Sequence, residues 1–386
     1  MRRKDRRKLL CNSELPSNSI VDSVTALALN LLSAAYPPIG GHLAYSRRGE
    51  TQTTLFSTPE STKPSDVREV HPYIISISRA TDIPAFYMDW FFERWKQGYI
   101  LWHSPYNQAF TQKVWFDNVR AAIFWTKDPQ TLCQYIQKLN TYPFLYYVQI
   151  SLNDYEPELE PGVPPLHDRI SAFQKLSQEL GPHRVIWRHD PLLLSDTISL
   201  STLCSRIEHL CDNLSAYTEK LIVSFIQIKR YKGVQRLLAT CAHSGVREFT
   251  SDEKLHFIRF LSEIEERYKI KTHICCEEQD PFVYSHTRPG DCVDRTLLLR
   301  LAKEKGEEYS DFISFLQDAK KDPGQRKKCS CIHAKDIGQY SSCLHSCKYC
   351  YANGNDAIVK ARHQAHMNCR RTKQDLPSLI PLNYTD

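Results

Sequence analysis

The segment YIISISRATD, residues 73–82, is the first of six stretches that together decide the fold. It is a short and nearly continuous apolar run that ends in polar residues. Similar runs occur at residues 121–126, 144–150, 184–188, 221–227 and 271–276. They are rich in Ile, Val, Phe and Tyr, which is typical of strands that are buried on both faces of a parallel sheet.

Helical patterns separate these runs. Apolar residues recur at spacings of three and four in residues 85–98, 167–181, 203–214 and 252–268. Gly98 and Gly181 stand where the first two of these helices would need a cap. The repeated order of strand and helix predicts an α/β fold, in the form of a (β/α) barrel or partial barrel.

The chain divides into four expected parts. Residues 1–72 are mixed and mostly polar with a basic start, and we expect a poorly ordered extension. Residues 73–320 contain the strand and helix pattern of the β/α barrel domain. Residues 321–368 form a cysteine-rich iron–sulfur cluster segment that we expect to pack on the barrel. Residues 369–386 form a tail.

Composition restricts the class of protein. The apolar and charged fractions, 41% and 24%, are ordinary for a soluble globular protein. No apolar run approaches the roughly 20 residues of a membrane span, so we expect a cytoplasmic protein without a membrane partner. Six of the 14 cysteines fall between residues 329 and 369. Clustered cysteines in a reducing compartment favour metal ligands over disulfides.

The net charge of +6 is unevenly placed. Residues 1–10 carry +5 and residues 320–386 carry +7, which leaves −6 for the body between them. One interpretation is that the two basic ends contact a polyanion such as nucleic acid. The other is that they are solvated tails and counter-charge for an anionic cluster and its cofactor.

Polar residues follow the predicted strands. Arg79 and Asp82 come after the first strand, Lys127 after the second, and Arg188 and Asp190 after the fourth. The C-terminal strand ends of a β/α barrel form its active-site mouth, so these side chains predict the binding of an anionic or zwitterionic ligand. For Asp190, which precedes a proline, helix or turn capping is the alternative.

The run CLHSCKYCYA contains three cysteines at Cys-x3-Cys-x2-Cys spacing. Cys343, Cys347 and Cys350 can hold three irons of a [4Fe–4S] cluster and leave the fourth iron open. An open iron lets a cluster bind and cleave S-adenosylmethionine (SAM), which indicates radical chemistry. In such a site, Tyr349 can lie against the adenine.

Zinc is the competing metal. Cys329 and Cys331, together with Cys347 and Cys350, would give an all-cysteine set of four ligands. The pair Cys329 and Cys331 can instead join two cysteines further upstream in a second site, which would hold zinc or another cluster. That second site would consist of Cys276, Cys292, Cys329 and Cys331.

Five stretches of the chain carry a resemblance to a known family. They are IISISRATDIPAF, FWTKDP, GPHRVIWRHDPLLL, KDPGQRKKCSC and DIGQYSSCLHSCKYCYAN. With them, the chain from Tyr73 to Asn353 resembles the bacterial domain of unknown function 1848. That family has a C-terminal cysteine cluster similar to that of radical SAM enzymes, and the cysteine block also looks like that of spore photoproduct lyases. The resemblance implies that Cys343, Cys347 and Cys350 are the cluster ligands.

The chain departs from ordinary radical SAM enzymes in two ways. Its triplet follows the β/α repeats instead of preceding them, and no Gly-Gly-Glu-Pro-type stretch is present. A circularly permuted radical SAM barrel would explain the first departure. Arg79, Asp82 or Arg188 would then take over the binding of SAM.

Two hypotheses of function follow. The first is a radical SAM-type lyase or oxidoreductase that forms a 5′-deoxyadenosyl radical, with flavodoxin or ferredoxin as electron donor and a nucleic acid or nucleotide as substrate. The alternative is a β/α-barrel binding protein, in which a structural zinc or iron–sulfur knot holds a basic tail that binds nucleic acid or a partner. A hydrolase that uses the mouth carboxylates is a third class, but no compact ligand motif such as His-Glu-x-x-His supports it.

Overall fold

The computed structural model describes residues 67–107, 110–276 and 288–381. These lie in one compact unit, residues 62–386. The predicted extension, residues 1–72, therefore falls largely outside the described residues. Only its last residues are described, and they include the strand β1 (Arg68–Val70).

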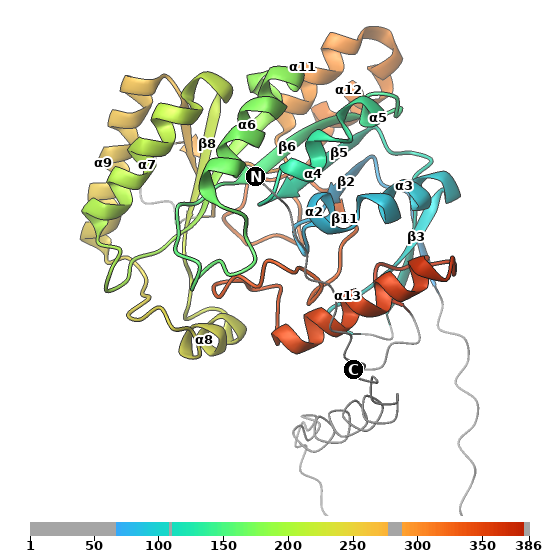
Figure 1. Cartoon of the computed structure of the whole chain (residues 1–386). Helices are drawn as coiled ribbons and strands as arrows, with labels where there is room; N and C mark the ends of the chain where they lie inside the picture. Colours follow the sequence, from blue (N-terminus) through green and yellow to red (C-terminus); the bar gives the residue numbers. More distant parts are fainter. Residues whose placement is uncertain (1–66, 108–109, 277–287, 382–386) are drawn as a thin grey trace, which may run out of the picture. The chain divides into compact units, whose positions relative to one another are not determined.

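An eight-stranded sheet forms the centre of the described chain (Figure 1). Its strands lie in the order β10-β9-β8-β7-β6-β5-β2-β11, and all neighbouring pairs are parallel. The strands are β2 (Ile74–Ile77), β5 (Ala121–Thr126), β6 (Leu145–Ser151), β7 (Val185–Leu192), β8 (Lys220–Phe225), β9 (Lys271–Ile274), β10 (Arg288–Pro289) and β11 (Lys335–Asp336).

The six apolar runs all form strands of this sheet, and they neighbour one another in chain order from β2 to β9. The prediction of an α/β fold with a parallel sheet is confirmed. The short strand β11 returns to lie beside β2 at one edge, whereas β10 forms the other edge of the described ladders. The pairing of the described strands does not show a closed barrel.

Both faces of the sheet are buried, which explains the continuous apolar runs. In β5, Ala122 and Phe124 belong to the core on one face, and Ala121 and Ile123 belong to the core on the other. All four are fully buried. Polar side chains can reach solvent or a ligand only where such strands end.

Helices cover both faces. In Figure 1, α6 (Leu166–Leu180), α7 (Leu200–Leu214) and α9 (Ser251–Tyr268) lie side by side along one face. On the other face, α11 (Arg295–Lys305) and α12 (Ser310–Asp318) bury Leu298 and Phe312. The shorter helices of the domain are α2 (Ile83–Phe86), α3 (Met88–Gln97), α4 (Gln130–Cys133), α5 (Ile136–Leu139) and α8 (Lys232–Ala239).

The predicted glycine caps are confirmed. Gly98 ends α3 in the left-handed region, with a φ of 82°, and Gly181 ends α6 with a φ of 87°. The helix predicted for residues 85–98 is divided in two at Tyr87, which lies between α2 and α3.

Several elements were not predicted from the sequence. A small sheet pairs β1 with β4 (Thr111–Trp115) and β4 with β3 (Tyr99–His103). The helix α13 (Asp356–Arg371) crosses the expected boundary between cluster segment and tail. Beyond it, the carbonyl groups of Leu376 and Pro377 accept hydrogen bonds from Trp90 and Leu101. The first part of the predicted tail therefore packs on the domain.

None of the helices in the described ranges is both long and apolar enough to cross a membrane.

Candidate functional site

The loop that carries the cysteine triplet lies at the C-terminal ends of β2 and β5. His345, within the triplet, has its Nε2 atom 2.8 Å from Oδ2 of Asp82, which follows β2. Asp82 also accepts hydrogen bonds from the backbone nitrogens of Ala85 (2.9 Å) and Lys127 (2.7 Å) and from Thr126 Oγ1 (3.0 Å). This carboxylate therefore caps α2 and joins two strand ends to the cysteine loop.

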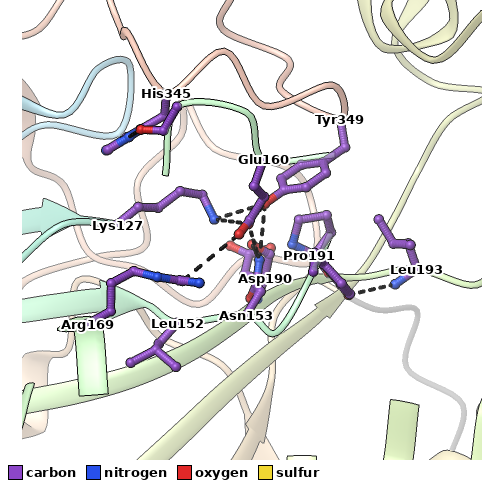
Figure 2. A network of polar contacts seen from close by, with 12 residues as sticks. Lys127, Leu152, Asn153, Glu160, Arg169, Asp190, Pro191, Leu193, His345 and Tyr349 are labelled. Carbon is purple, nitrogen blue, oxygen red and sulfur yellow. Dashed lines mark hydrogen bonds and ion pairs between the residues drawn. The ribbon is translucent and has the colours of Figure 1, made fainter. Parts of the chain in front are cut away.

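A buried network on the other side of the loop centres on Glu160 (Figure 2). Lys127 Nζ donates to Glu160 Oε1 and to the hydroxyl of Tyr349, both at 2.9 Å. Asn153 Nδ2 donates to the same two acceptors, at 3.1 Å each. The Tyr349 hydroxyl itself donates to Glu160. The aromatic residue of the triplet is thus fixed by three residues that are distant in sequence.

Glu160 is the counter-ion of two cations in this network. Glu160, 2% exposed, has Lys127 at 2.9 Å and Arg169 Nη1 at 3.9 Å from its oxygens. Burial alone would raise the pKa of Glu160, but the two cations outweigh it and hold that pKa below its ordinary value. Burial alone would likewise lower the pKa of Lys127, but Glu160 and Cys347 outweigh burial and raise that pKa above its ordinary value. Lys127 and Glu160 therefore act on Cys347 in opposite directions.

The three thiols of the triplet lie within electrostatic reach of one another. Burial raises the pKa of Cys347 to about 12, against the opposing effect of Lys127. Burial also raises the pKa values of Cys343 and Cys350. Among the described residues, no group of three or more His, Cys, Asp or Glu side chains is arranged to hold a metal ion as it stands. Even so, three thiols with Lys127 beside them are a donor set that suits a thiolate-bound cluster.

Arg79, a predicted ligand anchor, is paired with Asp336, the last residue of β11. Its backbone nitrogen donates to Asp336 Oδ2 at 2.7 Å, and its Nε atom lies 3.4 Å from the same oxygen. Its Nη2 atom donates to the carbonyl of Ala334 at 3.3 Å. Arg79 thus lies at the same strand end as the triplet, and it holds β11 against β2.

Arg188 and Asp190 were predicted to follow the fourth strand, but β7 continues to Leu192, so both lie within it and pair with each other there. Asp190 also accepts a hydrogen bond from Ser224, so the alternative of helix capping does not describe it. Arg188 points to the other face, where its Nη1 atom donates to Gln149 Oε1 at 3.1 Å and to Cys292 Sγ at 2.6 Å. Asp190 is bonded to Asn153 and Arg188 to Cys292, so this pair connects the Glu160 network to a second group of cysteines.

That second group contains every residue of the predicted second site. Cys276, Cys292, Cys329 and Cys331 are all buried and lie together, with Cys275 beside them. Cys275 was not among the residues predicted for this site.

Two further residues of the site were missed. Asn153 follows the third strand, so the rule applied to the other strand ends would have found it. Glu160 lies in the Pro-rich connection between β6 and α6, which has no strand or helix pattern that would mark it. Only the folded chain brings this loop against the triplet, where the nitrogen of Gly162 donates to the carbonyl of His345 at 3.0 Å.

The family model of the domain of unknown function DUF1848 matches residues 74–352. The chain belongs to this family. The match includes the strands of the main sheet, both groups of cysteines and the Glu160 network, so the geometry described above lies within the family's domain. No curated protein matches the chain.

His189, next to Arg188 and Asp190, has a buried imidazole whose protonation can be tested by the pH dependence of stability. It is fully buried, neither ring nitrogen has a hydrogen-bond partner within the described chain, and burial lowers its pKa to about 3. Because the unfolded chain binds a proton near pH 6.5 and the folded chain does not, stability should fall as pH drops from 6.5 toward 3. Between pH 7 and pH 4.5 the free energy of unfolding should therefore fall, in part because of His189. In His189→Phe we expect this fall to be smaller by about 2 kcal/mol.

Urea unfolding at the two pH values measures this difference. His209→Phe, at an exposed position of α7, is the matched control and should keep the pH dependence of the original chain. Equal pH dependence in the His189 variant and the original chain would contradict the assignment of a buried neutral imidazole.

Proposed function

We propose that this protein is an iron–sulfur enzyme of the radical SAM type, with a [4Fe–4S] cluster on Cys343, Cys347 and Cys350. The observation that carries the proposal is the position of the triplet. The loop of the triplet contacts Asp82, Lys127 and Asn153 through His345 and Tyr349. It therefore lies at the strand ends for which a ligand site was predicted. A cluster at this place could meet a ligand held by those strand ends.

When bound, such a cluster supplies one electron that cleaves SAM into methionine and a 5′-deoxyadenosyl radical, which takes a hydrogen atom from the substrate. The residues of the chain hold and shield this site. Lys127, although paired with Glu160, would add positive charge beside bound thiolates, and burial of Cys347, 5% exposed, would keep water from its sulfur. The contacts of His345 and Tyr349 fix the loop on both sides.

Arg79 is the best placed of the predicted anchors to bind the carboxylate of SAM. Lys127 has a short ion pair with the buried Glu160, Arg188 and Asp190 pair closely with each other, and Asp82 is bound by four groups. The Arg79–Asp336 pair is longer, at 3.4 Å, and both side chains are nearly one-fifth exposed. A ligand carboxylate could replace Asp336 there. Contact of Tyr349 with the adenine stays a prediction, since that ring is only 7% exposed.

The strand order supports the idea of a permuted barrel. The triplet follows β11, and β11 pairs in parallel with β2, the first strand of the series. In an ordinary barrel the cluster loop follows the first strand. In a permuted barrel, β11 would take the position of that first strand beside β2, and the loop after it would occupy the same place although it comes late in the chain. The late position of the triplet is compatible with the mechanism for this reason.

The test is reductive cleavage of SAM. We expect the full chain, reconstituted anaerobically with iron and sulfide, to form 5′-deoxyadenosine when dithionite and SAM are added. The variant Cys343→Ala/Cys347→Ala/Cys350→Ala should form none and should retain less iron. Cys133→Ala, a partly buried cysteine on α4, is the control and should behave like the original chain.

A chain that holds the cluster but forms no 5′-deoxyadenosine would contradict the proposal. If 5′-deoxyadenosine does form, the assay is repeated with flavodoxin or ferredoxin in place of dithionite to identify the electron donor. The basic ends and the resemblance to spore photoproduct lyases make nucleic acid or a nucleotide the first substrates to try.

One observation favours a second candidate function, a binding protein with a structural metal knot. All five predicted anchors have partners within the protein, as structural residues do. In that case zinc would occupy the triplet region, and the basic C-terminal segment would bind nucleic acid or a partner. Stoichiometric zinc at the triplet, without iron and without SAM cleavage, would favour this function.

A further inference from the structure

Five cysteines meet on the face of the sheet that packs against α11 and α12. Cys275 and Cys276 follow β9, Cys292 precedes α11, and Cys329 and Cys331 precede β11. All five are between 3% and 8% exposed. Three separate segments of the chain therefore bring five buried sulfurs to one place.

The sulfurs of this group are in mutual contact. Sγ of Cys275 lies 3.5 Å from that of Cys276 and 3.9 Å from that of Cys292. The thiol of Cys329 interacts with those of Cys276 and Cys331, and the thiol of Cys331 also interacts with that of Cys292. The contacts thus close a ring of five sulfurs.

Backbone nitrogens point at the sulfurs as well. Cys331 Sγ accepts hydrogen bonds from the nitrogens of Cys292 (3.1 Å) and Val293 (3.3 Å), and Cys329 Sγ accepts one from Cys331 (3.5 Å). Hydrogen bonds of this kind stabilise negative charge on sulfur and surround the thiolate ligands of metal sites. The surroundings of Cys329 and Cys331 therefore resemble those of metal ligands.

Two guanidinium groups face the same sulfurs. Arg188, 5% exposed, donates to Cys292 Sγ at 2.6 Å, and Arg326 interacts electrostatically with Cys275 and Cys276. Arg188 is buried and pairs with Asp190, whereas Arg326 is partly exposed and donates to Gln227 Oε1 at 3.2 Å. Positive charge beside these sulfurs is compatible with metal-bound thiolates.

Disulfides do not explain the group. A disulfide joins its sulfurs at about 2.0 Å, well below the 3.5 Å between Cys275 and Cys276, and all five cysteines are free. An odd number of cysteines would also leave one unpaired. The backbone of Cys276 adopts a φ of 56°, which few residues other than glycine tolerate, and such strain gathers at functional positions.

We propose that Cys276, Cys292, Cys329 and Cys331 form a second metal centre, a tetrathiolate site for zinc or an iron–sulfur cluster, with Cys275 packed against it. A tetrahedral zinc ion holds its four sulfurs about 3.8 Å apart, so the direct contacts of the Cys329 thiol with those of Cys276 and Cys331 are compatible with one ion. The thiols must turn from one another toward a common centre to bind it. This centre is independent of the SAM chemistry proposed for the triplet.

The test separates the two sites. The protein with Cys343→Ala/Cys347→Ala/Cys350→Ala, purified anaerobically, should still contain stoichiometric metal by mass spectrometry. Adding Cys329→Ser/Cys331→Ser should remove that metal. Cys211→Ala on α7, another fully buried cysteine, is the control and should leave the metal content unchanged.

A second measurement avoids variants that fail to fold. Cobalt exchanged into the triplet-free protein should give the intense ultraviolet charge-transfer band of thiolate ligands. Zinc would identify a single ion, and iron with sulfide would identify a cluster; both support the centre. A triplet-free protein that holds neither metal as purified, and takes up neither zinc, cobalt nor iron with sulfide, would overturn the proposal, whatever the result for SAM.

Discussion

Glu160→Gln should lower the free energy of unfolding by about 3–5 kcal/mol, the usual effect of removing one partner from a buried ion pair. The carboxylate is 2% exposed and faces two cations, Lys127 at 2.9 Å and Arg169 at 3.9 Å. A neutral amide of the same size keeps the shape but leaves both charges buried without a counter-ion. Urea unfolding at pH 7 measures the loss.

Glu156→Gln is the matched control, because it lies in the same loop but in a more exposed pair. Its carboxylate is 28% exposed and bonds Arg206 at 2.6 Å, so the expected loss is about 1 kcal/mol. The double variant Lys127→Met/Glu160→Gln should lose less than the sum of its two single variants, since both members of the pair are removed together. A loss in Glu160→Gln no larger than in the control would contradict the role given to this carboxylate.

Most strands of the main sheet were predictable because a strand that is buried on both faces has a continuous run of apolar residues. The run AAIFWT matches β5 residue for residue, and a strand of this kind has no polar face to confuse the pattern. The strands that were missed are short or partly exposed. β3 and β4 have mostly half-exposed residues, and β11 has only two, so neither alternation nor an apolar run can mark them.

The candidate site was predictable where the chemistry of single residues is distinctive, and not where it depends on contacts. The triplet and the polar strand ends could be found because cysteines at fixed spacing and charges after strands are local features. The partner of Lys127 could not, because Glu160 reaches it from a loop 33 residues away. Likewise, the sequence suggested four cysteines for a second site, but only the fold shows that Arg188 faces them.

Gly162→Ala should separate the Pro-rich loop from the cysteine loop. An added Cβ at this position would lie 2.4 Å from the carbonyl oxygen of Leu344 and 2.9 Å from Cα of His345, both backbone atoms that cannot turn away. The hydrogen bond from Gly162 to the His345 carbonyl at 3.0 Å, and the contact of His345 Nδ1 with the Gly162 carbonyl at 2.9 Å, would be lost. We expect a loss of about 2–4 kcal/mol in the free energy of unfolding, from overpacking and two broken hydrogen bonds.

The same substitution should expose the triplet before the domain unfolds. Because His345 holds the loop to Asp82, a displaced loop should make Cys343, Cys347 and Cys350 react faster with a thiol reagent under native conditions. Gly233→Ala is the control: a Cβ there meets nothing within 4 Å, and alanine favours the helix α8 in which it lies. If both variants unfold and react alike, the close approach of the two loops does not hold the cysteine triplet at the strand ends, and the structural basis of the proposed cluster site fails with it.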